Sequence, residues 1–254
     1  MSKDPIVLIL GDTPDARALA QSLHDAEIRG IYAHGGRKTL ASPLPIPTRI
    51  GGFGGADGLG RYIAEARITH IVDATHPFTK TMSQNAVLAA SRTGCPLLAL
   101  TRPVWKPGAG DTWIHAPDMA SAVAALDTNP QRIFLAVGRQ DVARFSRQPQ
   151  HHYLLRLSEP ARTQPPLPHH DIVVSSGPFD EARERALLIN QKIDLVVARN
   201  TGAPGSRAKL DAARSLELPV LMIDRPTLPK RPEVHAVGEV MAWLADAHPA
   251  RRRN

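Results

Sequence analysis

The chain has 254 residues, of which 43% are hydrophobic and 22% charged, as in soluble globular proteins of one large or two ordinary domains. It has no apolar run long enough for a transmembrane helix, and its first apolar run, Ile6 to Leu10, is too short for a signal-peptide core. We therefore expect a cytoplasmic protein without membrane contact. The single cysteine, Cys95, excludes an internal disulfide and a multi-cysteine metal site.

The formal net charge is +7, and most of the basic residues are arginine. Guanidinium groups match carboxylates and phosphates, so this balance favours a polyanionic ligand. GC-rich codon usage, which raises Arg, Ala and Pro together, explains the composition equally well. Nucleic acid is not expected, because aromatic residues make up only 4% of the chain and no nucleic-acid-binding signature is present.

Strand-like and helix-like segments alternate along the first hundred residues. Short apolar runs predict buried strands, and apolar residues at helical spacing predict helices. The predicted strands are Ile6 to Leu10, Ile28 to Ala33, Thr69 to Ala74 and Pro96 to Leu100. The predicted helices are Pro14 to Ala26, a segment including Arg61 to Ala66, and Pro77 to Arg92. This alternation predicts a parallel sheet covered by helices.

A segment rich in Pro and Gly, Arg102 to Gly110, interrupts the pattern and predicts a linker. A second series then follows. Its predicted strands are Arg132 to Val137, Tyr153 to Leu157, Ile172 to Ser175, Ile193 to Ala198 and Pro219 to Ile223. Its predicted helices are Asp180 to Asn190, Gly205 to Leu216 and Gly238 to Ala247.

The two series resemble each other, since Ile68 to Val72 aligns with Ile193 to Val197. We therefore predict an α/β fold of two Rossmann-like lobes with parallel sheets and an active-site cleft between them. The expected boundaries are a nucleotide-binding lobe at 1–102, a linker at 103–117, a second lobe at 118–248 and a basic tail at 249–254.

Three glycine-containing turns in the first half are candidate nucleotide-binding segments. The turn from Gly11 to Thr13 precedes a predicted helix, where amides bind phosphate, but it lacks the G-x-G-x-x-G pattern and also fits a plain capped turn. The next strand ends at Gly35 to Arg37. A basic residue there favours the 2′-phosphate of NADP, although a solvated loop is equally compatible. The third turn, Gly51 to Gly58, permits close approach of a ligand.

Polar side chains follow the predicted strand that ends near Ala74. Asp73 and Thr75 are candidate ligand contacts, and His76 is a candidate proton donor that could equally cap the next helix. In the second half, Arg139, Arg199 and Lys209 lie at or after strand ends and are candidate carboxylate binders. The histidine pairs lack metal-ligand spacing, so we expect no metal.

These segments together resemble the precorrin-6A reductase family of cobalamin (vitamin B12) biosynthesis, from Ile6 to about Trp243. The resemblance rests on the order and spacing of the turn Leu10-Gly11-x-Thr13-x-Asp15-Ala16-Arg17, Gly35-Gly36-Arg37, Gly51-Gly52-Phe53-Gly54-Gly55, Asp73 to Phe78, Arg102-Pro103-x-Trp105, Gly138-Arg139-Gln140, Gly177-Pro178-Phe179 and Ala208-Lys209-Leu210. Asp12 departs from the glycine common in the family, and Arg199-Asn200-Thr201 replaces a more usual Lys-Asn-Ser.

The resemblance implies NADPH-dependent reduction of one double bond of the macrocycle, from precorrin-6A to precorrin-6B. The implied nucleotide contacts are Gly11, Thr13, Gly35, Arg37, Gly52, Gly54, Asp73 and Thr75. The implied contacts to the anionic tetrapyrrole are Arg139, Arg199, Asn200 and Lys209. We expect no flavin, no metal, and a monomer or weak homo-oligomer.

Three alternatives remain open from the sequence. The first is reduction of the cobalt-containing analogue in the anaerobic pathway. The second is a two-lobed, nucleotide-dependent transferase, although no acidic metal-binding pair is apparent. The third is a non-catalytic sensor of a dinucleotide.

Overall fold

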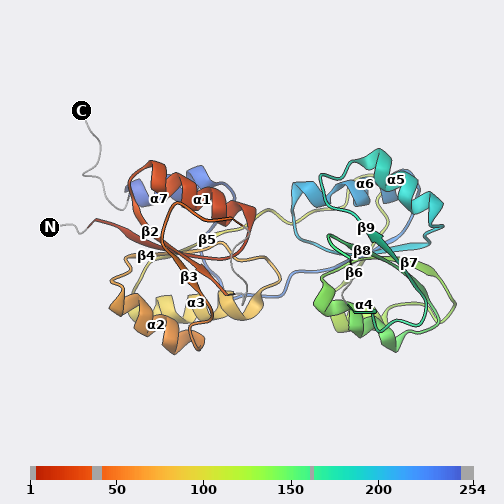
Figure 1. The fold of residues 1–254 in the computed structure, drawn as a ribbon, viewed down its shortest axis with the longest axis horizontal. Coiled ribbons are helices and arrows are strands. Elements are labelled where there is room, and N and C mark those ends of the chain that lie inside the picture. Colours follow the sequence, from red (N-terminus) through yellow and green to blue (C-terminus); the bar gives the residue numbers. More distant parts are fainter. Residues whose placement is uncertain (1–3, 36–41, 161–162, 247–254) are drawn as a thin grey trace. The chain divides into compact units, whose positions relative to one another are not determined.

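The computed structural model describes residues 4–35, 42–160 and 163–246 (Figure 1). The chain divides into unit 1, formed by Met1–Pro103 with Thr227–Asn254, and unit 2, formed by Val104–Pro226. Each unit contains one six-stranded sheet, and every described strand pairing in the two sheets is parallel. The predicted α/β class with two lobes is confirmed.

Unit 1 alternates strands and helices from its start. Its strands are β1 (Ile6–Leu10), β2 (Arg29–His34), β3 (Thr48–Ile50), β4 (His70–Asp73), β5 (Leu97–Leu100) and β12 (Glu233–Val234). Its helices are α1 (Pro14–Asp25), α2 (Gly55–Glu65), α3 (Lys80–Thr93) and α7 (Val237–Asp246). The sheet order is β12-β5-β4-β1-β2-β3, which is the 3-2-1-4-5-6 order of dinucleotide-binding sheets.

Strand β1 lies at the centre of this sheet, and its side chains alternate between two cores. Val7 and Ile9 pack with the buried faces of α1 and α7, whereas Leu8 and Leu10 pack with those of α2 and α3. Figure 1 shows α1 and α7 on one face of the sheet and α2 and α3 on the other. The continuous apolar run at Ile6–Leu10 therefore reflects a strand that is covered on both faces.

Unit 2 repeats this topology with a change in chain order. Its strands are β6 (Trp113–Ala116), β7 (Arg132–Ala136), β8 (His152–Leu157), β9 (His170–Val174), β10 (Leu195–Arg199) and β11 (Val220–Ile223). Its helices are α4 (Met119–Ala124), α5 (Glu181–Asn190) and α6 (Ala208–Ser215), with three-ten helices η1 (Arg139–Arg147) and η2 (Pro204–Ser206). The order β6-β11-β10-β7-β8-β9 matches that of unit 1 when β7 is taken as the first strand.

The unit boundaries differ from those expected at 103–117 and 118–248. Strand β6 lies inside the predicted linker, where it pairs with β11, and α7 belongs to unit 1 although it was expected in the second lobe. The buried residues Val240 and Leu244 of α7 pack into the same core as α1. Periodicity reveals the type of an element but not the sheet that it joins, which explains the difference.

No helix of the described residues is long and apolar enough to cross a membrane. Within the same residues, His, Cys, Asp and Glu side chains form no group of three that could hold a metal ion.

The placement of α7 predicts a stability effect. Leu244→Ala should lower the free energy of unfolding of unit 1 by about 2–5 kcal/mol, because a 2% exposed leucine would leave a cavity. Urea unfolding followed by circular dichroism measures this change. Leu88→Ala on α3 is the matched control, since Leu88 is 46% exposed and should change stability little. Equal effects of the two substitutions would contradict this placement of α7.

Candidate functional site

The carboxyl edge of the unit 1 sheet holds a cavity of about 600 Å³. Its walls come from the turn after β1, the end of β2, the loop between β3 and α2, and the segment from β4 into α3. The lining residues are Gly11, Asp12, Ala33, His34, Gly35, Gly52, Phe53, Gly54, Gly55, Leu59, Thr75, His76, Thr79, Thr81, Met82 and Asn85. Strands β1 and β4 flank the point where the strand order reverses, which is where open α/β sheets bind ligands.

A close backbone contact joins the turns after β1 and β4. Gly11 has a φ of +152°, and a Cβ atom added to it would lie 2.3 Å from the carbonyl oxygen of Ala74. Thr13 Oγ1 donates to the same carbonyl oxygen at 2.9 Å and accepts from the backbone N–H of Ala16 at 3.1 Å. Only glycine fits at position 11, and the Thr13 side chain is engaged as the cap of α1.

Asp73 is a buried anchor rather than part of the cavity lining. Its Oδ1 accepts from the backbone N–H of Thr75 at 3.1 Å and from Thr75 Oγ1 at 2.8 Å, while its Oδ2 pairs with Arg231. Thr75 Oγ1 also lies 3.0 Å from Ser83 Oγ on α3. Asp73 is only 1% exposed, so it orients Thr75, which does line the cavity.

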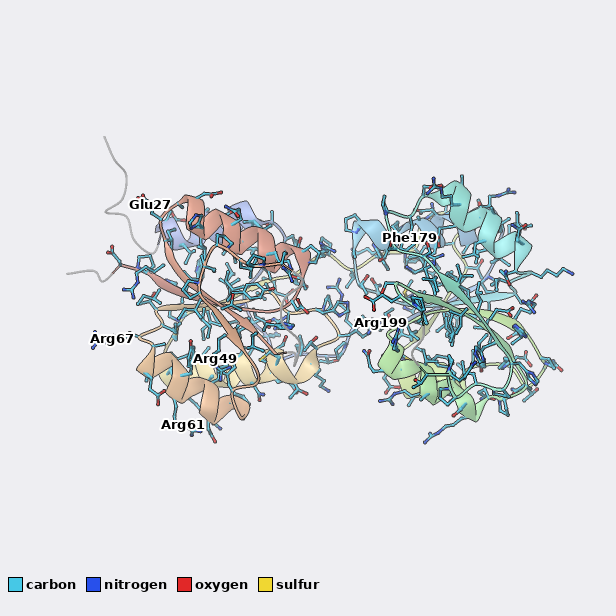
Figure 2. The ribbon with its side chains drawn as sticks, in the orientation of Figure 1. Glu27, Arg49, Arg61, Arg67, Phe179 and Arg199 are labelled. Atoms are coloured by element: carbon cyan, nitrogen blue, oxygen red, sulfur yellow. The ribbon has the colours of Figure 1, made fainter. Side chains whose placement is uncertain are left out.

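Arg49 at β3 braces the glycine-rich loop, and nothing in the sequence analysis singled it out. Its guanidinium donates to the carbonyl oxygens of Gly51 at 2.7 Å and Gly52 at 3.1 Å. The same group lies 4.1 Å from the ring centroid of Phe53 and 5.2 Å from that of Tyr62. Figure 2 shows Arg49 on the side of the sheet that α2 covers. An arginine two residues before a glycine-rich loop is the sequence signal that could have indicated this role.

His76 lines the cavity at the start of the segment that leads into α3. Its Nδ1 accepts from the backbone N–H of Phe78 at 3.2 Å. In this arrangement a neutral imidazole carries its proton on Nε2. The bond is made to Phe78, which lies before the N-cap Thr79 of α3, so His76 does not cap that helix; the geometry is compatible with a proton donor.

The structure brings six predicted residues into one cavity: Gly11, Gly35, Gly52, Gly54, Thr75 and His76. Thr13 and Asp73 lie beside it with their side chains bonded to the protein. Arg37 lies outside the described residues.

Cationic side chains gather at the carboxyl edge of the unit 2 sheet. Arg139 begins η1 and lines a small cavity of about 160 Å³ that also includes Leu155 and Pro166. Arg199 ends β10, and its guanidinium lies 3.8 Å from the carboxylate of Asp141 on η1. Strands β7 and β10, which supply these positions, flank the reversal of strand order as β1 and β4 do in unit 1.

Lys209, on the first turn of α6, lies in a desolvated and positively charged environment. Its Nζ donates to the carbonyl oxygen of Ser206 at 2.6 Å. Its pKa is lowered to about 8, mainly by burial; the carboxylate of Glu184 opposes this shift, and the guanidinium groups of Arg156 and Arg199 add to it. Lys209 therefore carries its charge at pH 7 and loses it above about pH 8.

Asn200 has a structural role in this unit. Its Oδ1 accepts from the backbone N–H of Trp105 at 2.8 Å, and its Nδ2 donates to the Trp105 carbonyl oxygen at 2.9 Å. Asn200 is only 4% exposed. These bonds attach the segment before β6 to the end of β10, so the Asn200 side chain is bonded to the protein, and its contact with the substrate stays a prediction.

Arg156 on β8 also joins the cationic edge and was missed in the sequence, where it stands inside an apolar strand. It forms an ion pair with the buried Glu184 of α5, with an N–O distance of 2.7 Å. Its guanidinium lies 4.3 Å from the ring centroid of Phe179 and 4.9 Å from that of Phe134.

Comparison with known proteins identifies the family. The sequence profile of the family described as precorrin-6x reductase CbiJ/CobK matches residues 6–245. The chain belongs to this family. A precorrin-6A reductase of Rhodobacter capsulatus is 48% identical over 240 residues, which cover 94% of this chain and 96% of that protein.

The solved structure of CobK precorrin-6A reductase is 47% identical and has a TM-score of 0.87 over 96% of this chain and 97% of that chain. A cobalt-precorrin-6A reductase of Priestia megaterium is 28% identical over 241 residues, which cover 88% of this chain and 91% of that protein. Family membership confirms the resemblance seen in the sequence and the prediction of an oxidoreductase of cobalamin biosynthesis.

The buried Asp73–Arg231 pair predicts a second stability effect. Arg231→Met should cost about 3–5 kcal/mol of stability, because it leaves the fully buried Asp73 carboxylate without its cation. Urea unfolding measures the loss. The control is Arg92→Met, which removes the partner of the exposed Asp57 and should have little effect. A loss no larger than in the control would show that the buried pair does not stabilise the fold.

Proposed function

We propose that this chain reduces precorrin-6A to precorrin-6B with NADPH as the hydride donor. The observation that carries the proposal is the glycine-lined cavity at the strand-order reversal of unit 1, in a chain that belongs to the precorrin-6x reductase family. When bound, NADPH would supply a hydride to one carbon of the macrocycle. The protein would supply binding, orientation and a proton.

The cavity suits a dinucleotide in shape and in its polar groups. A Cβ added at Gly52, Gly54 or Gly55 would meet nothing within 4 Å, so ligand atoms have room to approach the backbone. The Thr75 hydroxyl, oriented by Asp73, adds a directed polar group. Arg37, three residues after the end of β2, is assigned to the 2′-phosphate that distinguishes NADPH from NADH.

The cations of unit 2 suit a tetrapyrrole with ionised side arms. Arg139, Arg199 and Lys209 all come from segments at the carboxyl edge of its sheet. Two of them, Arg199 and Lys209, are held in place by Asp141 and by the Ser206 carbonyl oxygen. Charge-assisted hydrogen bonds from such preoriented groups would orient the macrocycle through its carboxylates.

The metal-free substrate is favoured over its cobalt analogue. The relative named for precorrin-6A is 48% identical to this chain, whereas the relative named for cobalt-precorrin-6A is 28% identical. Turnover of each form by the pure protein decides between them, and turnover of neither would reject the proposal.

Arg37→Ala should weaken NADPH binding about tenfold or more while leaving NADH binding nearly unchanged, since it removes charge-assisted bonds to the 2′-phosphate. Fluorescence titration of the wild type and the variant with both nucleotides measures this. Arg67→Ala, which changes an arginine outside the cavity lining, is the control. An unchanged preference for NADPH in Arg37→Ala would remove Arg37 from the site.

The binding of the anionic substrate should weaken at alkaline pH. Lys209 has a pKa of about 8 and loses its charge above that pH, so KM should rise about tenfold between pH 7 and pH 9. Lys209→Arg keeps the charge over this range and should flatten the rise. The same pH dependence in both proteins would assign the titration to another group.

His76→Gln should lower kcat about a hundredfold without changing the Kd of NADPH, if His76 Nε2 donates the proton to the carbon next to the hydride acceptor. Steady-state kinetics and nucleotide titration separate the two effects. A kcat within twofold of the wild type would assign proton donation to another group or to water.

A further inference from the structure

The chain crosses between its two units twice, and both crossings are attached to one short loop of unit 2. It enters unit 2 at Val104 and leaves it after Pro226. The neighbouring residues on the unit 2 side, Trp105 and Arg225, both bond to the segment that directly follows β10. Unit 2 is therefore tied at both of its chain ends to the loop after β10.

Four residues make this attachment, and we call them the crossing clamp: Trp105, Asn200, Thr201 and Arg225. Arg225 Nε donates to the Asn200 carbonyl oxygen at 2.9 Å, and its Nη2 donates to that of Thr201 at 3.0 Å. The Asn200 side chain bonds both backbone groups of Trp105, at 2.8 and 2.9 Å. The Asn200 N–H donates to the carbonyl oxygen of Ile223 at the end of β11. Because its guanidinium donor is charged and Asn200 is buried, the clamp holds its parts firmly together.

The crossing clamp adjoins two of the cations that we assign to the substrate. Arg199 ends β10 and directly precedes Asn200 in the chain. Lys209 Nζ lies 5.9 Å from the ring centroid of Trp105, within the range of a cation–π contact. A shift of the clamp would therefore move the backbone that carries Arg199 and the ring that borders Lys209.

We propose that Arg225 is a positioning residue for the reduction, because it fixes the loop that carries the substrate-binding cations to both chain crossings. The inference rests on the proposed function, in which unit 1 binds NADPH and unit 2 binds the macrocycle. Hydride transfer needs the donor and acceptor carbons at roughly 3–3.5 Å, and the two crossings are the covalent links between the units. Arg225 acts through Asn200 and Thr201 rather than on the reacting atoms.

Arg225→Met in the full chain tests this role, because a methionine side chain donates no hydrogen bond to the two carbonyl oxygens. With precorrin-6A as substrate, kcat should fall about tenfold or more, since a small misplacement of bound reactants slows transfer steeply. KM should change less than kcat, because Arg199 and Lys209 are still present. The Kd of NADPH should stay within about twofold, because its proposed cavity is formed by unit 1. Steady-state kinetics and nucleotide titration measure the three constants.

Two further variants separate positioning from a general loss of structure. Arg132 also donates to a backbone carbonyl oxygen, that of Gln191 at 2.6 Å, but it begins β7 at the amino edge of the same sheet. Arg132→Met should therefore leave kcat within about twofold of the wild type. Arg225→Lys keeps the charge and can serve one of the two carbonyl oxygens, so its kcat should lie between those of Arg225→Met and the wild type. If Arg225→Met does not fold, as judged by circular dichroism, Arg225→Lys must still show a reduced kcat.

The failure of this inference is distinguishable from the failure of the proposed function. A wild-type protein that reduces neither precorrin-6A nor its cobalt form would reject the proposed function itself. An active wild type with an unchanged kcat in Arg225→Met, or an equal loss in Arg132→Met, would overturn only the role of Arg225. A parallel loss of NADPH binding in Arg225→Met would also overturn it, because the damage would then extend to unit 1.

Discussion

The near-contact between Gly11 and the Ala74 carbonyl oxygen is the constraint on which the unit 1 site depends. A Cβ atom at position 11 would lie 2.3 Å from that oxygen, so the two turns could not meet if any other residue stood there. Because they meet, Thr13 reaches the same carbonyl oxygen, and the polar residues after β4 are presented at the reversal of strand order. Asp73 then orients the Thr75 hydroxyl by accepting its hydrogen bond on Oδ1, while Asp73 Oδ2 pairs with Arg231. The site is thus assembled by backbone packing and a buried carboxylate.

The sequence was informative where local pattern and structure coincide. The apolar runs at Ile6–Leu10 and Leu195–Arg199 are strands because both faces are covered, and the glycine loop lies at the cavity as expected. The sequence was less informative where a polar side chain could bond either to a ligand or to the protein itself. Thr13, Asp73 and Asn200 are polar residues next to a site, but their hydrogen bonds go to Ala74, Thr75 and Trp105.

Long-range pairing explains what the sequence did not reveal. Arg231 is 158 residues from Asp73, and Arg156 is 28 residues from Glu184, so no local pattern connects either pair. Arg49 is closer to its partners, yet its stacking on Tyr62 requires α2 to lie over β3. Electrostatic partners of this kind are specified by the fold as a whole.

The sixth strand of each sheet affects how this chain can fold while it is being translated. Strand β6 follows β5 in the chain but joins the sheet of unit 2, and β12 follows β11 but joins the sheet of unit 1. On the ribosome, the whole of unit 2 therefore emerges before unit 1 has its final strand and α7. Until β12 has been synthesised, the edge of β5 that β12 covers in the folded unit stays unpaired and open to other strands. Unit 1 can therefore complete its sheet only after the segment that follows unit 2 has been made.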